Sequence, residues 1–216
     1  LPTERFKFDN DKFLISYISE SNGSLKEVWD RITDEQNKEL QTAVGKKDKK
    51  FPNNYVSELN MEYKKWVKNI SKSINNGIIM IIDYGYNSQE YFLDDRMEGT
   101  LVCIHNHQPN FDPLINIGSQ DISSFVNFSH ISNLAVKNGL TVDGYLPQSS
   151  LLLNLGILEI FESKDYRADK KVDELNKLKN ILLPNTMGEI FKTLVLTKNI
   201  DRKLLSTKEY NQINKL

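Results

Sequence analysis

The chain has 216 residues, of which 39% are hydrophobic and 26% are charged. This composition supports an ordinary globular domain and excludes a disordered chain. A formal net charge of −1 gives no general attraction to nucleic acid or to an anionic membrane. A single cysteine excludes an internal disulfide framework and suits a reducing compartment. No apolar run approaches the roughly 20 residues of a membrane-spanning helix, and no signal-peptide pattern is present.

The segment RFKFDNDKFLISYI has two alternating stretches of apolar and polar residues around Asp9-Asn10-Asp11. Alternation around a short polar turn predicts a β-hairpin within residues 1–20. Residues 21–53 are polar and charged, and Thr33 with Gln36 three positions later predicts a capping box and a short helix. The lysine run at 46–50 could bind an anion, although a solvated loop is the favoured interpretation. We expect residues 21–53 to form an insertion outside the sheet that is mobile around this run, because the segment has little to bury.

A helix followed by a buried strand is predicted next. Residues 54–76 carry an apolar stripe at three- and four-residue spacing, closed by Asn75-Asn76-Gly77, which predicts a helix. The unbroken apolar run Ile78–Ile82 predicts a central parallel strand covered on both faces. Together they resemble the αβ half of a doubly wound unit.

Asp83, Tyr84 and Gly85 follow this apolar run directly. In open α/β sheets, ligands bind beyond the carboxyl ends of the strands, so these residues occupy the expected place of a site. Asp83 could instead cap the loop by accepting hydrogen bonds from backbone N–H groups. We expect it to face a cleft near Tyr84 and the segment around His107, and not to form a buried salt bridge.

The rest of the chain continues the alternation of strands and helices. Strands are predicted at 98–107, 121–128, 140–146 and 191–198, with a loop containing Pro and Gly at 108–118. Helices are predicted at 129–139, 149–163 and 169–183, the first closed by Gly139 and the last ended before Pro184. The elements together predict one α/β domain with additional helices.

Sequence motifs give little direct information on chemistry. Cys103, His105 and His107 alternate on an extended segment and would share one face, but their spacing is unlike common zinc patterns, so we expect no metal. The chain has no G-x-S-x-G, P-loop or H-E-x-x-H motif. It also lacks a strand followed by a glycine-rich G-x-G-x-x-G turn, which brings backbone N–H groups against a nucleotide cofactor. A cofactor-binding half is therefore not recognised in this sequence.

Six sequence blocks occur in an order that resembles the C-terminal half of the MidA-type methyltransferases, which use S-adenosylmethionine. The blocks are YVSELNMEYKKWVKNI, GIIMIIDYGYNSQEYF, RMEGTLVCIHNHQPNFDPL, GSQDISSFVNFSHI, GYLPQSSLLLNLGI and MGEIFKTLVL. The resemblance runs from Leu1 to about Leu205 and is strongest to the bacterial branch. Mitochondrial members of the family are protein-arginine methyltransferases that assist complex I assembly.

The resemblance implies the C-terminal part of a class I Rossmann-like methyltransferase sheet with a helical insertion. It divides the chain into a hairpin at 1–20, an insertion at 21–53, the C-terminal half of the methyltransferase domain at 54–205 and a tail at 206–216. The residues that bind S-adenosylmethionine are expected upstream of Leu1, in a missing N-terminal half that would act as a partner. The implied compartment is the bacterial cytoplasm, or the mitochondrial matrix in a eukaryote.

Methyl transfer from a sulfonium is an in-line displacement, so the protein mainly has to align the reacting atoms and exclude water. A guanidinium acceptor, which the resemblance implies, would be held in bidentate fashion by carboxylates. The candidates are Asp83, Glu58 and Asp121. Glu58 could instead be a favourable charge in the first turn of a helix, and Asp121 could be a loop cap.

Tyr84, His107 and Gln148 are candidate substrate-binding residues, because each lies in a family-like block at a strand end or turn. Core packing or backbone hydrogen bonds would explain them equally well. The resemblance thus implies the substrate side of a methyltransferase that acts on a protein arginine or another nucleophile. The alternative is a non-catalytic protein-binding or assembly-factor module. Substrate identity and oligomeric state are left open.

Overall fold

The computed structural model describes residues 1–45 and 49–216, and they form two compact units. Unit 1 comprises residues 1–65 and 86–130, and unit 2 comprises residues 66–85 and 131–216. Unit 1 therefore combines the predicted hairpin, the predicted insertion and part of the segment that follows. Among the described residues, no helix has the length and apolar character needed to cross a membrane.

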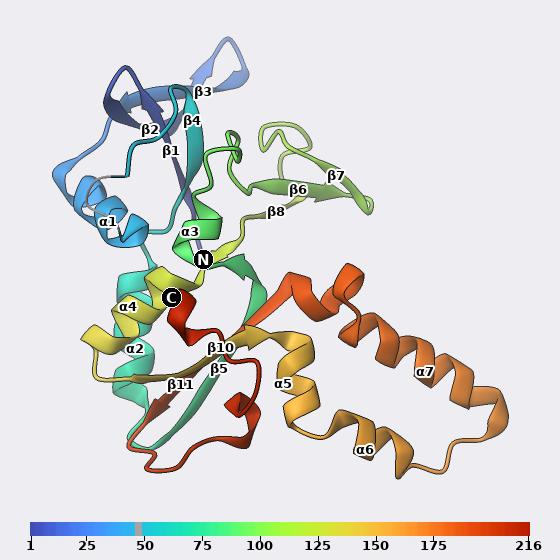
Figure 1. Ribbon diagram of the computed structural model, residues 1–216. Helices are drawn as coiled ribbons and strands as arrows, with labels where there is room; N and C mark the ends of the chain where they lie inside the picture. The colour runs from blue at the N-terminus through green and yellow to red at the C-terminus, as the bar shows by residue number, and fades with distance from the viewer. Residues whose placement is uncertain (46–48) are drawn as a thin grey trace. The chain divides into compact units, whose positions relative to one another are not determined.

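Unit 1 is built on a four-stranded antiparallel sheet in the order β3-β2-β1-β4, labelled in Figure 1. Its strands are β1 (Glu4–Asp9), β2 (Lys12–Ser21), β3 (Ser24–Arg31) and β4 (Tyr55–Leu59). The predicted hairpin is confirmed, because β1 and β2 pair across a turn at Asn10 and Asp11. Both turn residues have positive φ angles, which Asn and Asp tolerate better than most residues.

The expectation that residues 21–53 lie outside the sheet is wrong, because β3 pairs with β2 along its whole length. Helix α1 (Asp34–Val44) follows, and the capping box predicted at Thr33 is confirmed. The helix buries Leu40, Ala43 and Val44 against the sheet core. These three residues have helical spacing, which is enough to dock one short helix despite its polar composition.

Phe51 is also buried in the core of unit 1, at 6% exposure, where its ring lies against Phe6, Tyr55 and Phe92. The end of the expected insertion therefore contributes core contacts. Of the predicted lysine run, residues 46–48 lie outside the described residues. Within the rest of the run, Lys49 Nζ lies 2.7 Å from Asp94 Oδ1.

The single helix predicted at 54–76 is replaced by β4 and the helix α2 (Tyr63–Ser73). All five residues of β4 are buried, and the strand pairs with β1. Between the two elements, Asn60 Oδ1 accepts hydrogen bonds from the backbone N–H groups of Glu62 and Tyr63, both at 3.1 Å. This capping side chain marks the boundary between the strand and the helix. The continuous apolar spacing over residues 54–76 did not indicate this boundary.

The remainder of unit 1 contains short elements. They are α3 (Ser88–Tyr91), β6 (Val102–His105), β7 (Gln108–Asn110), β8 (Asp121–Ser123) and β9 (Val126–Asn127). Strands β6, β7 and β8 form a small sheet in the order β7-β6-β8. The predicted loop at 108–118 therefore begins with a strand. His107 lies in the β6–β7 turn with a φ of 61°, so the expected extended alignment of Cys103, His105 and His107 is wrong.

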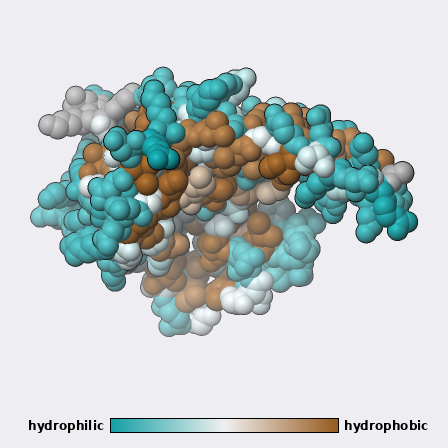
Figure 2. Space-filling view, turned by 90° about the horizontal axis from the view of Figure 1, so that it is seen from below, coloured by the Kyte–Doolittle hydropathy of each residue, from teal (hydrophilic) through white to brown (hydrophobic). Residues whose placement is uncertain are grey.

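Unit 2 contains β5 (Gly77–Tyr86), β10 (Thr141–Pro147) and β11 (Phe191–Lys198), with β11 between the other two. Because β11 is antiparallel to both neighbours, β5 and β10 run in the same direction. The predicted two-sided burial of β5 is wrong, and its pairing with β11 is antiparallel. Ile78, Met80 and Ile82 share one face and are 43–46% exposed, so the described residues cover only the other face well. Figure 2 shows hydrophobic residues at the surface on one face of the molecule.

The helices of unit 2 largely follow the prediction. They are α4 (Phe128–Lys137), α5 (Gln148–Asn154), α6 (Ile157–Glu162) and α7 (Ala168–Leu182). Gly139, with a φ of 77°, follows α4 as expected, and α7 ends before Pro184. The helix predicted at 149–163 is divided into α5 and α6 at Gly156, whose φ of 78° is in the left-handed region.

Candidate functional site

Three of the predicted site residues gather at one edge of the sheet in unit 2. The strand register places Asp83 opposite Lys192 and Lys192 opposite Pro147. Asp83 and Pro147 are therefore in one row, two strand spacings or roughly 10 Å apart. Because β5 and β10 run in the same direction, the next residues, Tyr84 and Gln148, lie towards the same edge. Carboxyl ends of strands are the usual place for ligands in open α/β sheets.

Asp83 lies within β5, which continues to Tyr86, and not after the strand as predicted. Its Oδ1 accepts a hydrogen bond of 2.8 Å from the backbone N–H of Tyr84. Burial raises the pKa of Asp83 from the ordinary value of 3.8, while this hydrogen bond partly opposes the rise. Asp83 is thus a half-buried carboxyl group that takes up a proton more readily than an exposed one.

Tyr84 and Gln148 each contact another element of unit 2. The ring of Tyr84 lies 4.9 Å from that of Phe191, measured between centroids. Gln148 is the first residue of α5, and its Nε2 donates to the carbonyl oxygen of Ile181 at 3.5 Å. The hydrogen bond is at the long limit, so the Gln148 amide is weakly held.

Glu58 lies in β4, so the alternative of a charge in the first turn of a helix is wrong. Its side chain is 3% exposed, and donors from α3 and from the segment before β6 surround the carboxylate. The backbone N–H groups of Thr100 and Leu101 donate to Oε1 at 2.9 and 3.0 Å. The hydroxyl groups of Thr100 and Tyr91 donate to Oε2 at 2.8 and 3.2 Å.

This arrangement makes Glu58 an anchor for the turn at residues 99–101. A Cβ atom added to Gly99 would clash with Glu58 Oε1, so only glycine leaves room for the carboxylate. Burial raises the pKa of Tyr91 well above its ordinary value, and the charge of Glu58 raises it further. The Tyr91 hydroxyl therefore remains a donor to Glu58. The contacts of Glu58 suit a structural role, and its catalytic role stays a prediction.

Asp121 and His107 both line an open groove beside the small sheet of unit 1, together with Asn106, Ser119 and Gln120. The structure thus brings these two predicted residues to one surface. Glu58, His107 and Asp121 belong to unit 1, whereas Asp83, Tyr84 and Gln148 belong to unit 2. A common cleft that contains both groups stays a prediction.

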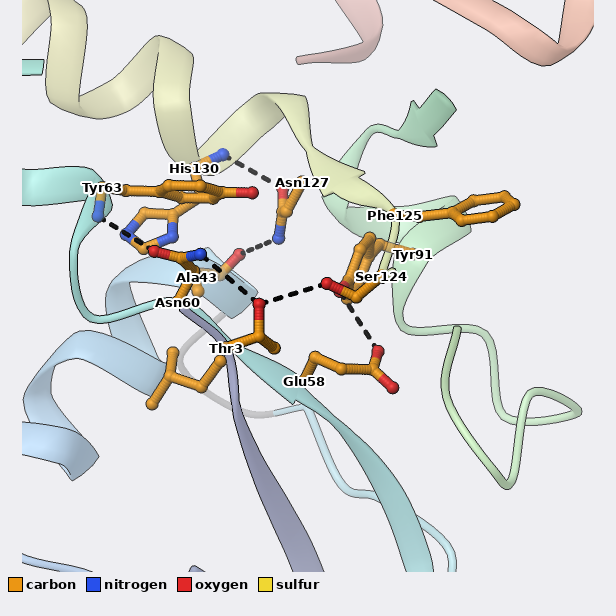
Figure 3. Close-up of a pocket in the computed structure, with 11 residues that line it drawn as sticks. Thr3, Ala43, Glu58, Asn60, Tyr63, Tyr91, Ser124, Phe125, Asn127 and His130 are labelled. Atoms are coloured by element: carbon orange, nitrogen blue, oxygen red, sulfur yellow. Dashed lines mark hydrogen bonds between the residues drawn. The ribbon is translucent and has the colours of Figure 1, made fainter. Parts of the chain in front are cut away.

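Sequence reasoning missed a polar cluster in unit 1, shown in Figure 3, that lines a cavity of about 10 Å³. This volume holds about one water molecule. His130 is 1% exposed, and its Nε2 lies 2.7 Å from Glu39 Oε1. The ring of Tyr63 lies 5.6 Å from the His130 ring. The cavity is too small for a cofactor, so the cluster suits a structural role.

Asn127 connects three segments within this cluster. Its Nδ2 donates to the carbonyl oxygen of Ala43 at the end of α1, at 3.1 Å. Its Oδ1 accepts from the backbone N–H of His130 and from the hydroxyl of Ser88, both at 3.0 Å. An Asn placed directly before an apolar helix is an N-cap signal that could have identified this residue from the sequence.

The described residues contain no group of three or more His, Cys, Asp or Glu side chains that could hold a metal ion. The edge at Asp83 is the best candidate, because it combines a half-buried acid with the aromatic and amide side chains of Tyr84 and Gln148.

The model of a protein family described as "Putative S-adenosyl-L-methionine-dependent methyltransferase" matches residues 1–146. The chain belongs to this family. The expected methyltransferase family is thereby confirmed, while the narrower MidA-type assignment stays a prediction. A comparison with curated proteins gave no match.

Two crystal structures from Burkholderia thailandensis resemble this family member over its whole length. One, described as a "likely methyl transferase" bound to S-adenosyl-homocysteine, has a TM-score of 0.91 and 24% sequence identity. The other, described as uncharacterized, has a TM-score of 0.90 and 25% identity. Each alignment includes all of this chain, but it includes only 55% of the first relative and 57% of the second. It therefore has the fold of slightly more than half of each relative.

Proposed function

We propose that residues 1–216 form the acceptor side of a methyltransferase that uses S-adenosylmethionine and methylates a protein arginine. The family match and the fold shared with a protein that binds S-adenosyl-homocysteine support the reaction class. The observation that carries the proposal is the edge formed by Asp83, Tyr84 and Gln148. It offers a carboxylate, an aromatic ring and an amide at the carboxyl ends of two strands that run in the same direction.

In this proposal, Asp83 binds the guanidinium of the acceptor and directs one nitrogen towards the methyl group. Ionised Asp83 can accept two parallel N–H hydrogen bonds from the planar cation. The cation favours the ionised carboxyl group, which offsets the effect of burial on the pKa of Asp83. Tyr84 follows Asp83 within β5, so its side chain is on the opposite face and would contact another part of the substrate, while Gln148 supplies a polar group at the rim.

The cofactor contacts are proposed to come mainly from a segment outside residues 1–216. Both Burkholderia relatives are longer, and this chain has the fold of only part of each. The exposed apolar side chains of Ile78, Met80 and Ile82 provide a surface on which that segment could pack.

Isothermal titration calorimetry of the 216-residue chain with S-adenosylmethionine tests whether the cofactor contacts come mainly from outside residues 1–216. The proposal predicts no one-to-one isotherm at micromolar strength, and such an isotherm would contradict it. The reaction is tested separately with the complete natural protein, labelled S-adenosylmethionine and mass spectrometry of candidate protein substrates. Methylarginine in the product supports the proposal. Transfer to another atom would replace the proposed acceptor, and no transfer to any substrate would favour the non-catalytic protein-binding module.

A further inference from the structure

A groove in unit 1 lies apart from the candidate site in unit 2. It is lined by Arg5, Arg96, Phe111, Phe125 and the consecutive residues 98–102. Its volume of about 710 Å³ is within the roughly 300–1,000 Å³ typical of ligand-binding pockets. The lining is mostly apolar, with few polar groups, which is the usual composition of a binding site.

Arg96 is a half-buried cation at this groove. Within residues 1–45 and 49–216, no carboxylate lies within ion-pair distance of its guanidinium. Its Nη2 donates one long hydrogen bond of 3.5 Å to the carbonyl oxygen of Glu90, and its buried Nε has no partner. A partly buried charge without a counterion is unfavourable until a partner binds.

Aromatic stacking fixes the position of Arg96. The guanidinium carbon lies 4.5 Å from the centroid of the Tyr86 ring, and the Tyr86 ring lies 5.3 Å from that of Phe125. The cation is therefore held in place before any ligand arrives, which reduces the conformational entropy lost on binding.

Among the described residues, Arg96 is the one arginine of this groove without an ion pair, which suits one carboxylate and not a polyanion. Arg5 is neutralised, because its Nη1 donates to both oxygens of Glu27 at 2.8 and 2.9 Å. Glu98 is exposed on the lining and would repel further negative charge. A nucleic acid or a phosphate-rich ligand is therefore disfavoured, whereas one acidic group could pair with Arg96.

We propose that the groove binds a peptide segment of a partner protein in which an acidic side chain stands next to aromatic or aliphatic side chains. The carboxylate pairs with Arg96, and the apolar neighbours pack on Phe125 and on Phe111, which is 76% exposed. A peptide suits the groove because Phe111 and Phe125 both line it and offer apolar contacts to side chains beside the carboxylate. This site goes beyond the proposed methyl transfer and does not depend on it.

The proposal is tested by fluorescence anisotropy with the labelled pentapeptide Phe-Phe-Glu-Phe-Phe. No S-adenosylmethionine is needed in this assay. We expect saturable binding to the 216-residue chain and binding at least about tenfold weaker for the matched peptide with glutamine, since hydrogen bonds to charged groups contribute most. Arg96→Met should weaken binding by a similar factor, whereas the control Arg202→Met, at an exposed arginine of unit 2, should leave it unchanged.

Phe111→Ala keeps the test valid if Arg96→Met disturbs folding, because Phe111 is mostly exposed and its loss should leave the circular dichroism spectrum and Tm unchanged. We expect it to weaken peptide binding several-fold, with Tyr210→Ala as the matched exposed aromatic control. Equal affinity for the glutamate and glutamine peptides would overturn the proposal. So would unchanged binding in folded Arg96→Met, or equally strong displacement by 3-phenylpropionate, which would indicate a small-molecule site.

Discussion

The backbone N–H of Thr100 donates to both carboxylate oxygens of Glu58, at 2.9 and 3.0 Å. This contact joins β4 to a segment more than forty positions later in the chain, and the same carboxylate binds the N–H of Leu101. Glu58 therefore stabilises the turn that forms the floor of the groove beside Arg96. Its removal should affect folding before it affects chemistry.

Glu58→Ala should lower the free energy of unfolding by about 3 kcal/mol, because it leaves buried N–H donors of Thr100 and Leu101 unsatisfied. Urea denaturation measures the change. Glu162→Ala, at an exposed position of α6, is the control and should change stability by less than about 0.5 kcal/mol. A Glu58→Ala protein as stable as this control would show that the carboxylate does not anchor the turn.

Gly99→Ala should destabilise the chain more than Gly118→Ala. Both glycines have φ angles near +76°, so alanine is strained at either position, but of the two only the Gly99 Cβ would meet other atoms within 4 Å, those of the Glu58 carboxylate. The difference in unfolding free energy should be about 1–2 kcal/mol, the usual effect of overpacking. Adding Glu58→Ala should reduce this difference, because it removes the clash. Equal effects of the two glycine substitutions would argue against the close packing of Glu58.

Thr33→Ala should lower the free energy of unfolding by about 1 kcal/mol through loss of the α1 capping box. The hydroxyl of Thr33 accepts from the backbone N–H of Gln36, and the Gln36 side chain accepts from the N–H of Thr33. Thr33→Ser keeps the hydroxyl and should restore most of the loss. Chemical denaturation of the three proteins makes the comparison, and equal instability of both variants would contradict a capping effect.

Asp83 should make stability depend on pH. Its pKa in the folded chain is above the ordinary value of 3.8, so the folded state binds a proton more strongly than the unfolded state. Stability should therefore fall as the pH rises from about 4 through the raised pKa of Asp83. Asp83→Asn removes this contribution, so its stability relative to the natural protein should increase over the same interval. Parallel pH profiles of the two proteins would contradict the burial of Asp83.

Much of the secondary structure was predictable because local signals were strong. The β1–β2 hairpin, the start of α1 at Thr33 and the end of α4 before Gly139 each depend on residues close in sequence. The division of residues 54–76 was not predictable from spacing, because Val56 and Leu59 fit a helical stripe and a buried strand equally well. Pairing of β4 with β1, a long-range interaction, decides between them.

The candidate site was predictable only in part. The apolar run at 78–82 suggested burial on both faces, but burial depends on which elements pack against the strand, and the antiparallel β11 lies beside it. The position of Asp83 and Gln148 at one edge follows from register, which the sequence does not reveal. The contacts of Glu58 were equally hidden, since its partners are distant in sequence.

The central claim is that Asp83 positions the acceptor for methyl transfer. The most direct test compares the complete natural protein with its Asp83→Asn variant in transfer of a labelled methyl group, with Asp201→Asn at an exposed position as the control. The account predicts that Asp83→Asn lowers kcat about 100-fold, as loss of one electrostatic contact often does, while the KM for S-adenosylmethionine and the control remain unchanged and the Tm of the variant does not fall. Equal kcat values for the natural protein and a folded Asp83→Asn variant would contradict it.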